Sequence, residues 1–390
     1  MKIVLVNTQT PGGAYVACQR LYNALKKQGV DVSFVAIKAT KWSFLWERFC
    51  IWVANRFSRK NLFAVSIANT GTDISKLPEV CEADIIHLHW INQGGLSLHN
   101  IQQIQALGKP IVWTMHDMWP FTGICHHAYE CLAYEKQCGR CPQASNILAK
   151  QVYENKRRVW HKMHFVGCSR WITALAEKSG LKLDNMVCSI PNPIDTELFC
   201  PITKQKAKME LGLDDKKKYV LFGAMNTTAP MKGFQYLLEA DKLLHDENIQ
   251  YLVVGKNSAT LINQLAHEGI DLGYVTDERQ KALIYNAADV FITPSLAENL
   301  PNMIMEAMAC GTPCVGFKIG GIPEMIDHQI NGYVAKYKNA EDLARGIEWV
   351  LSAKNDLSKE ARQKVMNAYS EEVVVNQYIA LYQSILKEAF

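Results

Sequence analysis

A regular alternation of short apolar runs with helix-length segments constrains the fold of this chain more than any other feature of its sequence. In the segment 13–28, Ala17, Leu21 and Leu25 recur at helical spacing, and Gly29 follows as the residue that ends the helix. Strands that are apolar throughout and alternate with helices form parallel sheets covered on both faces, so we predict an α/β protein. The expected strands are Lys2–Asn7, Val32–Ile37, Asp84–Leu88, Ile111–Thr114, Phe165–Cys168, Tyr219–Gly223, Tyr251–Val254, Val290–Thr293 and Cys314–Phe317.

The alternation breaks at Ile190–Asp195 and restarts at Tyr219. Pro191 and Pro193 lie within the break and exclude regular secondary structure there. A chain of 390 residues is long for one domain, and two of ordinary size are expected. We therefore place a domain boundary at this break. Because ligands bind beyond the carboxyl ends of the strands in such sheets, two facing domains would form a cleft.

Composition excludes several classes of protein. The hydrophobic content of 48% and charged content of 21% are typical of a soluble globular protein, and a net charge of +4 is too small to predict nucleic-acid binding. The apolar run Met1–Val6 ends at Asn7 without a small-residue cleavage site, and no uncharged apolar stretch is long enough to cross a bilayer. We expect a cytoplasmic protein whose cysteines are mostly reduced.

The segment Pro294–Pro313 carries two carboxylates at the end of an expected strand. Pro301 suits the first position of a helix and Gly311 the position just past its end, so Glu298 should lie in the preceding loop and Glu306 on the helix. Such a helix start favours anions because its first amides lack partners within the helix. The arrangement predicts a site for a phosphorylated sugar between two acceptors, which is the donor site of a sugar-nucleotide glycosyltransferase.

Lys232 lies just ahead of another expected helix and is placed to meet a leaving diphosphate. An isolated lysine before a helix is more often a solvated surface residue, and only the Glu298–Glu306 segment favours the functional interpretation. In the first half, Gly12 and Gly13 open a helix after the first strand and would let backbone approach a ligand. A plain strand–helix turn explains them equally well, and the absence of G-x-G-x-x-G argues against a dinucleotide oxidoreductase.

Histidines cluster after two strands of the first half. His116 follows an expected strand and could hydrogen-bond a sugar hydroxyl or stabilise charge near the anomeric carbon, and a structural histidine is the alternative. We expect His87, His89 and Trp90 to line the acceptor side.

Cysteines are concentrated in the loop after His116, at positions 125, 131, 138 and 141. The spacing predicts a structural zinc site formed by Cys125, Cys131, Cys138 and Cys141, in which His126 or His127 could replace a thiol. Disulfides or free thiols are the alternatives. Four protein ligands would leave no open position, so the metal would fold the loop and take no part in catalysis.

The segment 41–63 mixes aromatic with basic residues. This composition suits the interface of an anionic membrane, and the alternative is a helical hairpin whose aromatics face the core. The residues concerned are Trp42, Phe44, Trp46, Phe49, Trp52, Phe57 and Phe63, with Lys41, Arg48, Arg56, Arg59 and Lys60.

With these motifs, the chain resembles the family 4 retaining glycosyltransferases of the GT-B fold over nearly its whole length. The segment Pro294–Pro313 matches the family's E-x7-E and the following E-A-M-A-x-G-x-P, and Pro191–Phe199 resembles its interdomain N-G-V-D…F. His116-Asp117 with the cysteine cluster resembles a bacterial subgroup that works on exopolysaccharide or other cell-surface glycans.

The resemblance implies two Rossmann-like domains that face each other across a cleft: 1–192, completed by a returning helix at 371–390, and 193–370. It implies a donor domain that binds a UDP- or GDP-sugar and an acceptor that is a glycan or a lipid-linked sugar. Lys232 would bind the diphosphate, Glu298 and His116 the transferred sugar, and Glu306 the ribose. The other donor contacts it implies are Gly12, Gly13, Leu300, Pro301 and Asn302, with Tyr274 near the base.

The chain departs from this pattern at Ala224-Met225-Asn226, where many relatives have an arginine. Either Asn226 makes a weaker polar contact or another cation serves. The sequence contains no D-x-D, so we expect chemistry without a metal and without a protein nucleophile. An epimerase acting on sugar nucleotides, or a zinc-containing protein that binds sugar nucleotides without catalysis, are the alternatives.

Overall fold

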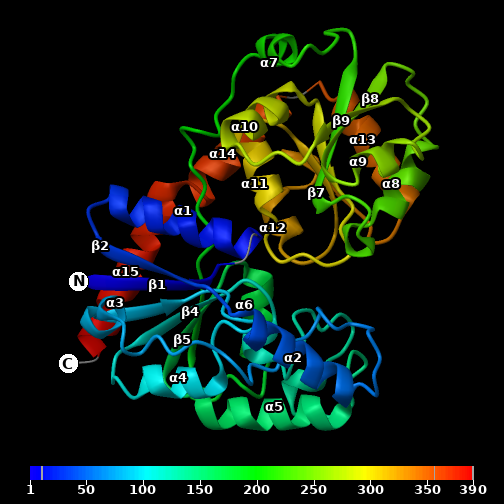
Figure 1. Cartoon of the computed structure of the whole chain (residues 1–390). Coiled ribbons are helices and arrows are strands. Elements are labelled where there is room, and N and C mark those ends of the chain that lie inside the picture. Colours follow the sequence, from blue (N-terminus) through cyan, green and yellow to red (C-terminus); the bar gives the residue numbers. More distant parts are fainter. Residues whose placement is uncertain (10–11, 355, 389–390) are drawn as a thin grey trace. The chain divides into compact units, whose positions relative to one another are not determined.

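The computed structural model describes residues 1–9, 12–354 and 356–388 (Figure 1). The chain divides into two compact units, one formed by Met1–Pro193 with Val374–Phe390 and the other by Ile194–Val373. The first unit thus contains both the beginning and the final helix of the chain. Within the described residues, no helix has both the length and the apolar character that crossing a bilayer requires.

The N-terminal unit is built on a parallel sheet in the order β2-β1-β3-β4-β5-β6. Alternate side chains of its strands enter two different cores, as the strand period of two requires. In β4, for example, Val112 enters one core and Trp113 the other. The strands are β1 (Lys2–Thr8), β2 (Asp31–Ile37), β3 (Ile85–Leu88), β4 (Ile111–Met115), β5 (Met163–Gly167) and β6 (Met186–Ser189).

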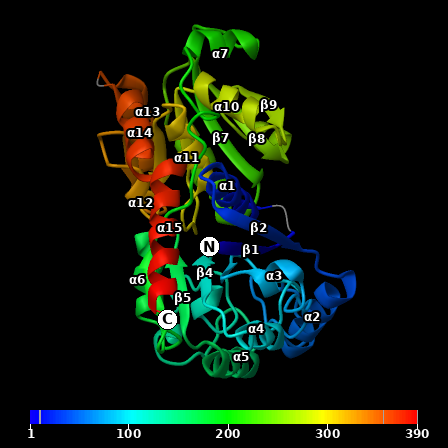
Figure 2. The ribbon, with the colours of Figure 1, turned by 90° about the vertical axis from the view of Figure 1, so that its left-hand side faces the viewer.

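Helices cover both faces of this sheet. One core lies under α1 (Gly13–Lys27) and α15 (Glu371–Glu388). Figure 2 shows α15, in red, running along the sheet, where its Tyr378 and Tyr382 are buried. The other core contains residues of α3 (Pro78–Glu82), α4 (Leu98–Gln105), α5 (Asn146–Val159) and α6 (Arg170–Glu177). The remaining elements are α2 (Lys41–Ala54), η1 (Trp119–Phe121) and η2 (Ala133–Glu135).

The C-terminal unit has a second parallel sheet, in the order β12-β11-β10-β7-β8-β9. Two parallel sheets with helices on both faces confirm the predicted α/β class. The strands are β7 (Lys218–Asn226), β8 (Ile249–Lys256), β9 (Gly269–Gly273), β10 (Val290–Thr293), β11 (Cys314–Phe317) and β12 (Gly332–Ala335). The sequence did not predict β6, β9 and β12.

The helices of this unit also form two layers. Residues of α8 (Phe234–Asp241), α9 (Ser258–Ile262) and α13 (Ala340–Ser352) share a core with one face of the sheet. On the other face, Tyr285 of α10 (Glu278–Ala287) packs on Phe291, and the Cys314 thiol lies against the Ile304 carbonyl of α11 (Asn302–Ala309). The other elements are α7 (Lys204–Glu210), η3 (Pro230–Lys232), α12 (Ile322–Met325) and α14 (Leu357–Ala368).

Candidate functional site

At the carboxyl edge of the C-terminal sheet, the structure brings Lys232 and Glu298 together. The Lys232 ammonium forms an ion pair with Glu298 Oε1, and the Ser295 hydroxyl donates to the same oxygen at 3.1 Å. The Lys232 side chain is 36% exposed and that of Glu298 15%. A half-exposed cation held by a more buried carboxylate is therefore presented at the edge where ligands bind in sheets of this kind.

Backbone contacts fix this pair in place. Gly233 has φ +67°, and a Cβ there would lie 1.8 Å from the carbonyl oxygen of Pro294, so the turn after Lys232 packs directly on the end of β10. Gly320 has φ +58°, and its Cβ would lie 1.8 Å from the carbonyl oxygen of Glu298. Only glycine fits these two close approaches, because both the conformation and the space exclude a side chain. The positions of both charged residues are thus set by the fold.

The second carboxylate, Glu306, lies in different surroundings. It is nearly buried on α11, and the Tyr285 hydroxyl donates to its Oε2 at 2.8 Å. Pro301 precedes the first helical residue by one position, so the prediction that it occupies the first helical position is wrong by one residue. Gly311, at φ +80°, follows the helix end as predicted. Leu300, Pro301 and Asn302 lie between the two carboxylates, at the start of α11.

A second cation lies at the ends of β7 and β8. Asn226 pairs in register with Lys256, and the Asn226 side-chain oxygen accepts from Asn257 Nδ2 at 3.0 Å. The Lys256 ammonium lies 5.4 Å from the centroid of the Tyr274 ring, which was predicted to meet the nucleobase. Lys256 is thus a cation beside Asn226 in the sheet, and Asn226 occupies the position where many relatives have an arginine. The sequence contained a signal for it, since the lysine lies two residues after the predicted strand Tyr251–Val254.

In the N-terminal unit, the residues after β3 and β4 form a histidine pair. His89 Nδ1 and His116 Nε2 are 2.9 Å apart, and the two rings are stacked. Burial lowers the pKa of His116 to about 4 and that of His89 well below its ordinary value. Both imidazoles are therefore neutral at pH 7.

The two nitrogens of His89 differ in their surroundings. Among the described residues, His89 Nε2 is buried without a hydrogen-bond partner, whereas Nδ1 is hydrogen-bonded with His116 Nε2. Between two neutral rings this hydrogen bond joins the N–H of one ring to the unprotonated nitrogen of the other.

His87 lies beside this pair, with its ring centroid 4.4 Å from that of His89, but it is fully buried and does not line an acceptor side as predicted. Its Nδ1 lies 2.7 Å from the Tyr382 hydroxyl and its Nε2 2.8 Å from Thr114 Oγ1. Its side chain faces α15, because residues of β3 alternate between the two faces of the sheet. His87 is a core histidine.

Asp117 holds the loop that follows His116. Its carboxylate accepts from Trp90 Nε1 at 2.9 Å and contacts His126 Nδ1 at 2.6 Å. Burial alone would raise the pKa of Asp117, and the neighbouring His126 outweighs it and lowers that pKa to about 2. The other nitrogen of His126 lies 3.0 Å from Ser66 Oγ. Both His126 nitrogens are therefore engaged, and this histidine does not replace a thiol as a metal ligand.

The four cysteines of the predicted zinc site line one small cavity. All four are free thiols, and burial raises the pKa of Cys125 to about 12 and that of Cys138 to about 11. Within the described ranges, no group of three or more His, Cys, Asp or Glu side chains is arranged to hold a metal ion. The four thiols lie around one cavity but are not arranged as the ligands of a metal ion, so the zinc site stays a prediction.

The glycines before α1 lie at the carboxyl end of β1. Gly13 is the first residue of the helix, and a Cβ built on Gly12 would meet no protein atom within 4 Å. The fold itself therefore leaves space for a larger residue at position 12. Thr10 and Pro11, which precede these glycines in the sequence, lie outside the described residues.

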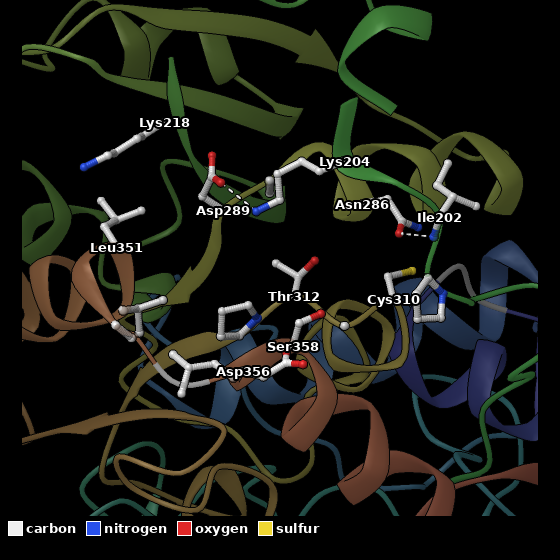
Figure 3. A pocket seen from close by; sticks show the side chains of 17 residues that line it. Ile202, Lys204, Lys218, Asn286, Asp289, Cys310, Thr312, Leu351, Asp356 and Ser358 are labelled. Atoms are coloured by element: carbon white, nitrogen blue, oxygen red, sulfur yellow. Dashed lines mark hydrogen bonds and ion pairs between the residues drawn. The ribbon is translucent and has the colours of Figure 1, made fainter. Parts of the chain in front are cut away.

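A cavity of about 400 Å³ lies at the opposite, amino edge of the C-terminal sheet (Figure 3). Its lining includes Lys204 and Asp289, which form an ion pair of 2.6 Å, and Asn286, whose oxygen accepts from the Ile202 amide at 2.8 Å. Lys218, which also lines the cavity, pairs with Asp246 at 2.8 Å, and the cavity is separate from the carboxyl-edge residues described above.

Comparison with known families places the two halves of the chain in related groups. Residues 203–369 match the model "Glycosyl transferases group 1", and residues 11–198 match "Glycosyltransferase Family 4". An uncharacterized glycosyltransferase of Methanocaldococcus jannaschii is 27% identical over 83% of this chain and 90% of its own length.

A second relative is named for its activity. The N,N'-diacetylbacillosaminyl-diphospho-undecaprenol alpha-1,3-N-acetylgalactosaminyltransferase of Campylobacter jejuni is 30% identical over 62% of this chain and 65% of its own length.

Solved structures share the fold. Sucrose-phosphate synthase from Thermosynechococcus elongatus superposes with a TM-score of 0.70 at 18% identity, over the whole of both chains. The Anabaena protein HepE in complex with UDP-glucose superposes with a TM-score of 0.66 at 16% identity, over 98% of this chain and 99% of HepE. At these identities the likeness shows the fold alone.

Proposed function

Because this chain belongs to the glycosyltransferases of the GT-B fold, we propose that it transfers a hexose from a UDP- or GDP-sugar to a glycan or lipid-linked acceptor, with retention of configuration. The observation that carries the proposal is the Lys232–Glu298 pair at the carboxyl edge of the C-terminal sheet. An ammonium has three donors, so Lys232 can keep Glu298 and still donate to a phosphate oxygen. Glu298 then accepts from hydroxyls of the transferred sugar.

The leaving diphosphate determines the chemistry that the protein must supply. As the sugar–phosphate bond loosens, charge grows on the phosphate oxygens, and Lys232 stabilises it with Lys256 as a second cation. The acceptor hydroxyl attacks on the face that the diphosphate leaves and passes its proton to the diphosphate. This route needs no protein nucleophile, and without D-x-D the lysines take the place of a bridging metal.

His116 would act through a neutral imidazole in this reaction. Its pKa of about 4 keeps positive charge away from the anomeric carbon, where positive charge itself develops. Held beside His89 by the hydrogen bond between the two rings, His116 would contact a hydroxyl of the transferred sugar. Gly12 and Gly13 would approach the diphosphate, Glu306 would bind the ribose, and Tyr274 would lie near the base.

The acceptor class is proposed from the relatives. The Campylobacter enzyme, by its name, acts on a diphospho-undecaprenol sugar, and so does an Escherichia coli relative that is 28% identical over 49% of this chain. We extend this to a role in surface polysaccharide biosynthesis at the cytoplasmic face of the membrane.

A thermal-shift screen of the full chain against UDP-, GDP- and ADP-sugars tests the proposal. A donor present at about 1,000 times its Kd stabilises the folded state by roughly 4 kcal/mol and raises Tm. Sugar nucleotides with one of the three bases should raise Tm. With such a donor, the nucleoside diphosphate should be released only when an acceptor is added. No shift with any donor would end the proposal, and conversion of the donor without an acceptor would replace it with epimerisation.

A further inference from the structure

The helix α2 turns its apolar side toward solvent. Trp42 is 82% exposed and Trp46 54%, and Leu45, Phe49 and Val53 lie exposed on the same stripe at helical spacing. The sequence left open a hairpin whose aromatics face the core, and this alternative is wrong for these side chains. We call α2 with the turns that follow it, residues 41–63, the aromatic–basic surface (Figures 1 and 2).

The opposite side of α2 is buried, and the charged Glu47 and Arg48 lie there with the apolar Ile51. Glu47 and Arg48 form an ion pair of 2.9 Å there, and Glu47 Oε1 accepts from the amides of Ile67 and Ala68 at 2.7 and 3.0 Å. Arg48 donates to the carbonyl of Val65 at 2.9 Å. These contacts fix the buried side of the helix to the protein, so the aromatic stripe is held facing outward.

The exposed charges beside the stripe are all positive. Glu47 is the sole acidic residue between positions 38 and 63, and it is buried. A positively charged surface repels a second copy of itself and attracts a negatively charged surface. The exposed cations are Lys38, Lys41, Arg56, Arg59 and Lys60.

The far end of α2 is joined to the start of α5. Asn55 Oδ1 accepts from the Ser145 amide at 2.7 Å, and Asn61 Nδ2 donates to the Gln143 carbonyl at 3.1 Å. Between these segments lies a cavity of about 520 Å³, whose lining includes Arg56, Lys60 and the exposed Ile147. Two cations thus line a hollow directly beside the aromatic stripe, where a phosphate group would be neutralised.

We propose that the aromatic–basic surface docks this protein on an anionic bilayer. Tryptophan and phenylalanine enter the boundary between headgroups and acyl chains, while arginine and lysine meet lipid phosphates, and both kinds of side chain are present on one fixed face. The inference goes beyond the proposed activity, because the docking concerns the surface alone and would hold for any acceptor.

Flotation with vesicles tests the docking without any measurement of activity. The full chain should float with vesicles of 70% phosphatidylcholine and 30% phosphatidylglycerol, bind at least ~10-fold more weakly to pure phosphatidylcholine, and be released at high salt. The double variant Trp42→Ser, Trp46→Ser should lose at least ~10-fold in partition, since both apolar anchors are removed. Arg59→Gln with Lys60→Gln should reduce binding to the anionic vesicles only.

A matched control comes from the other unit. Met209 is 73% exposed, so Met209→Ser removes an exposed apolar side chain elsewhere and should float as the wild type does. All variants change exposed residues, and unchanged Tm values should confirm that they fold. Absence of wild-type flotation, or equal flotation of Trp42→Ser, Trp46→Ser, would overturn the proposal. A wild-type dimer that this double variant dissociates, without vesicle binding, would assign the surface to self-association instead.

Discussion

Replacement of Lys232 by alanine is the sharpest test of the candidate site. The change removes the ammonium that pairs with Glu298 and leaves that carboxylate with the Ser295 hydroxyl at 3.1 Å. Stability should change little, because ion pairs that are partly exposed contribute only about 0–1 kcal/mol. Tm should therefore fall by no more than a few degrees, and the fold should be retained.

The effect on turnover should be much larger. Removing one preorganised donor to an oxyanion costs roughly 2.7–4 kcal/mol in the transition state, and each ~1.36 kcal/mol is a factor of ten in rate. Because Lys232 is 36% exposed, water partly screens its charge and we expect the lower end of this range, about a hundredfold loss of kcat. KM for the donor should rise less, since the charge grows as the bond breaks.

A lysine in the same unit provides the control. Lys204 is 45% exposed and pairs with Asp289 at 2.6 Å. It lies at the amino edge of the sheet, opposite the edge where Lys232 is proposed to bind the diphosphate. Steady-state assays with the donor found by thermal shift should show Lys204→Ala near wild type. A Lys232→Ala enzyme within threefold of wild-type kcat, or an equal loss in Lys204→Ala, would refute the assignment.

Three further outcomes are expected. As the pH drops from about 6.5 toward 4, His116 should lower the free energy of unfolding by up to roughly 1.4 kcal/mol per pH unit, because the unfolded chain then binds a proton that the folded chain excludes. Urea titrations at pH 7 and 5 measure this change. In His116→Asn the free energy of unfolding should depend less steeply on pH. If zinc is bound, elemental analysis should find about one metal per chain and Cys138→Ser with Cys141→Ser should lose it, whereas metal-free wild type with unchanged Tm in chelator would end that idea. Lys256→Ala should lower kcat/KM for the donor about tenfold, and an unchanged value would leave Lys232 as the main phosphate contact.

The sequence predicted the interior strands and the edge strand β2, and it missed β6, β9 and β12, which are the other three edge strands. Interior strands are buried on both faces and read as continuous apolar runs, whereas edge strands are not held to this pattern. In β9, glycines at 269 and 273 enclose three residues and none of the five is fully buried. Pairing with β8 makes this segment a strand, and that pairing is invisible in the local sequence.

The histidines show a second limit. His87 and His89 are two residues apart, a spacing that suggested a shared role near the acceptor. The strand ends between them, and although their ring centroids are 4.4 Å apart, His87 bonds Tyr382 of α15 whereas His89 bonds His116. Tyr382, which bonds His87, is 295 residues away in the chain. A contact across such a distance is set by the packing of the last helix, which the spacing of the histidines does not reveal.

The two carboxylates of the segment Pro294–Pro313 look equivalent in the sequence and are unlike in the fold. Glu298 lies in a loop held by backbone contacts and keeps a cation beside it, so it can accept a ligand hydroxyl without losing its compensating charge. Glu306 is nearly buried and already accepts from Tyr285. Tyr285 therefore orients Glu306, as Lys232 and Ser295 orient Glu298. The spacing of the carboxylates predicts that they share one segment, whereas the partner of each carboxylate comes from another element and distinguishes the proposed ribose contact of Glu306 from the proposed sugar contact of Glu298.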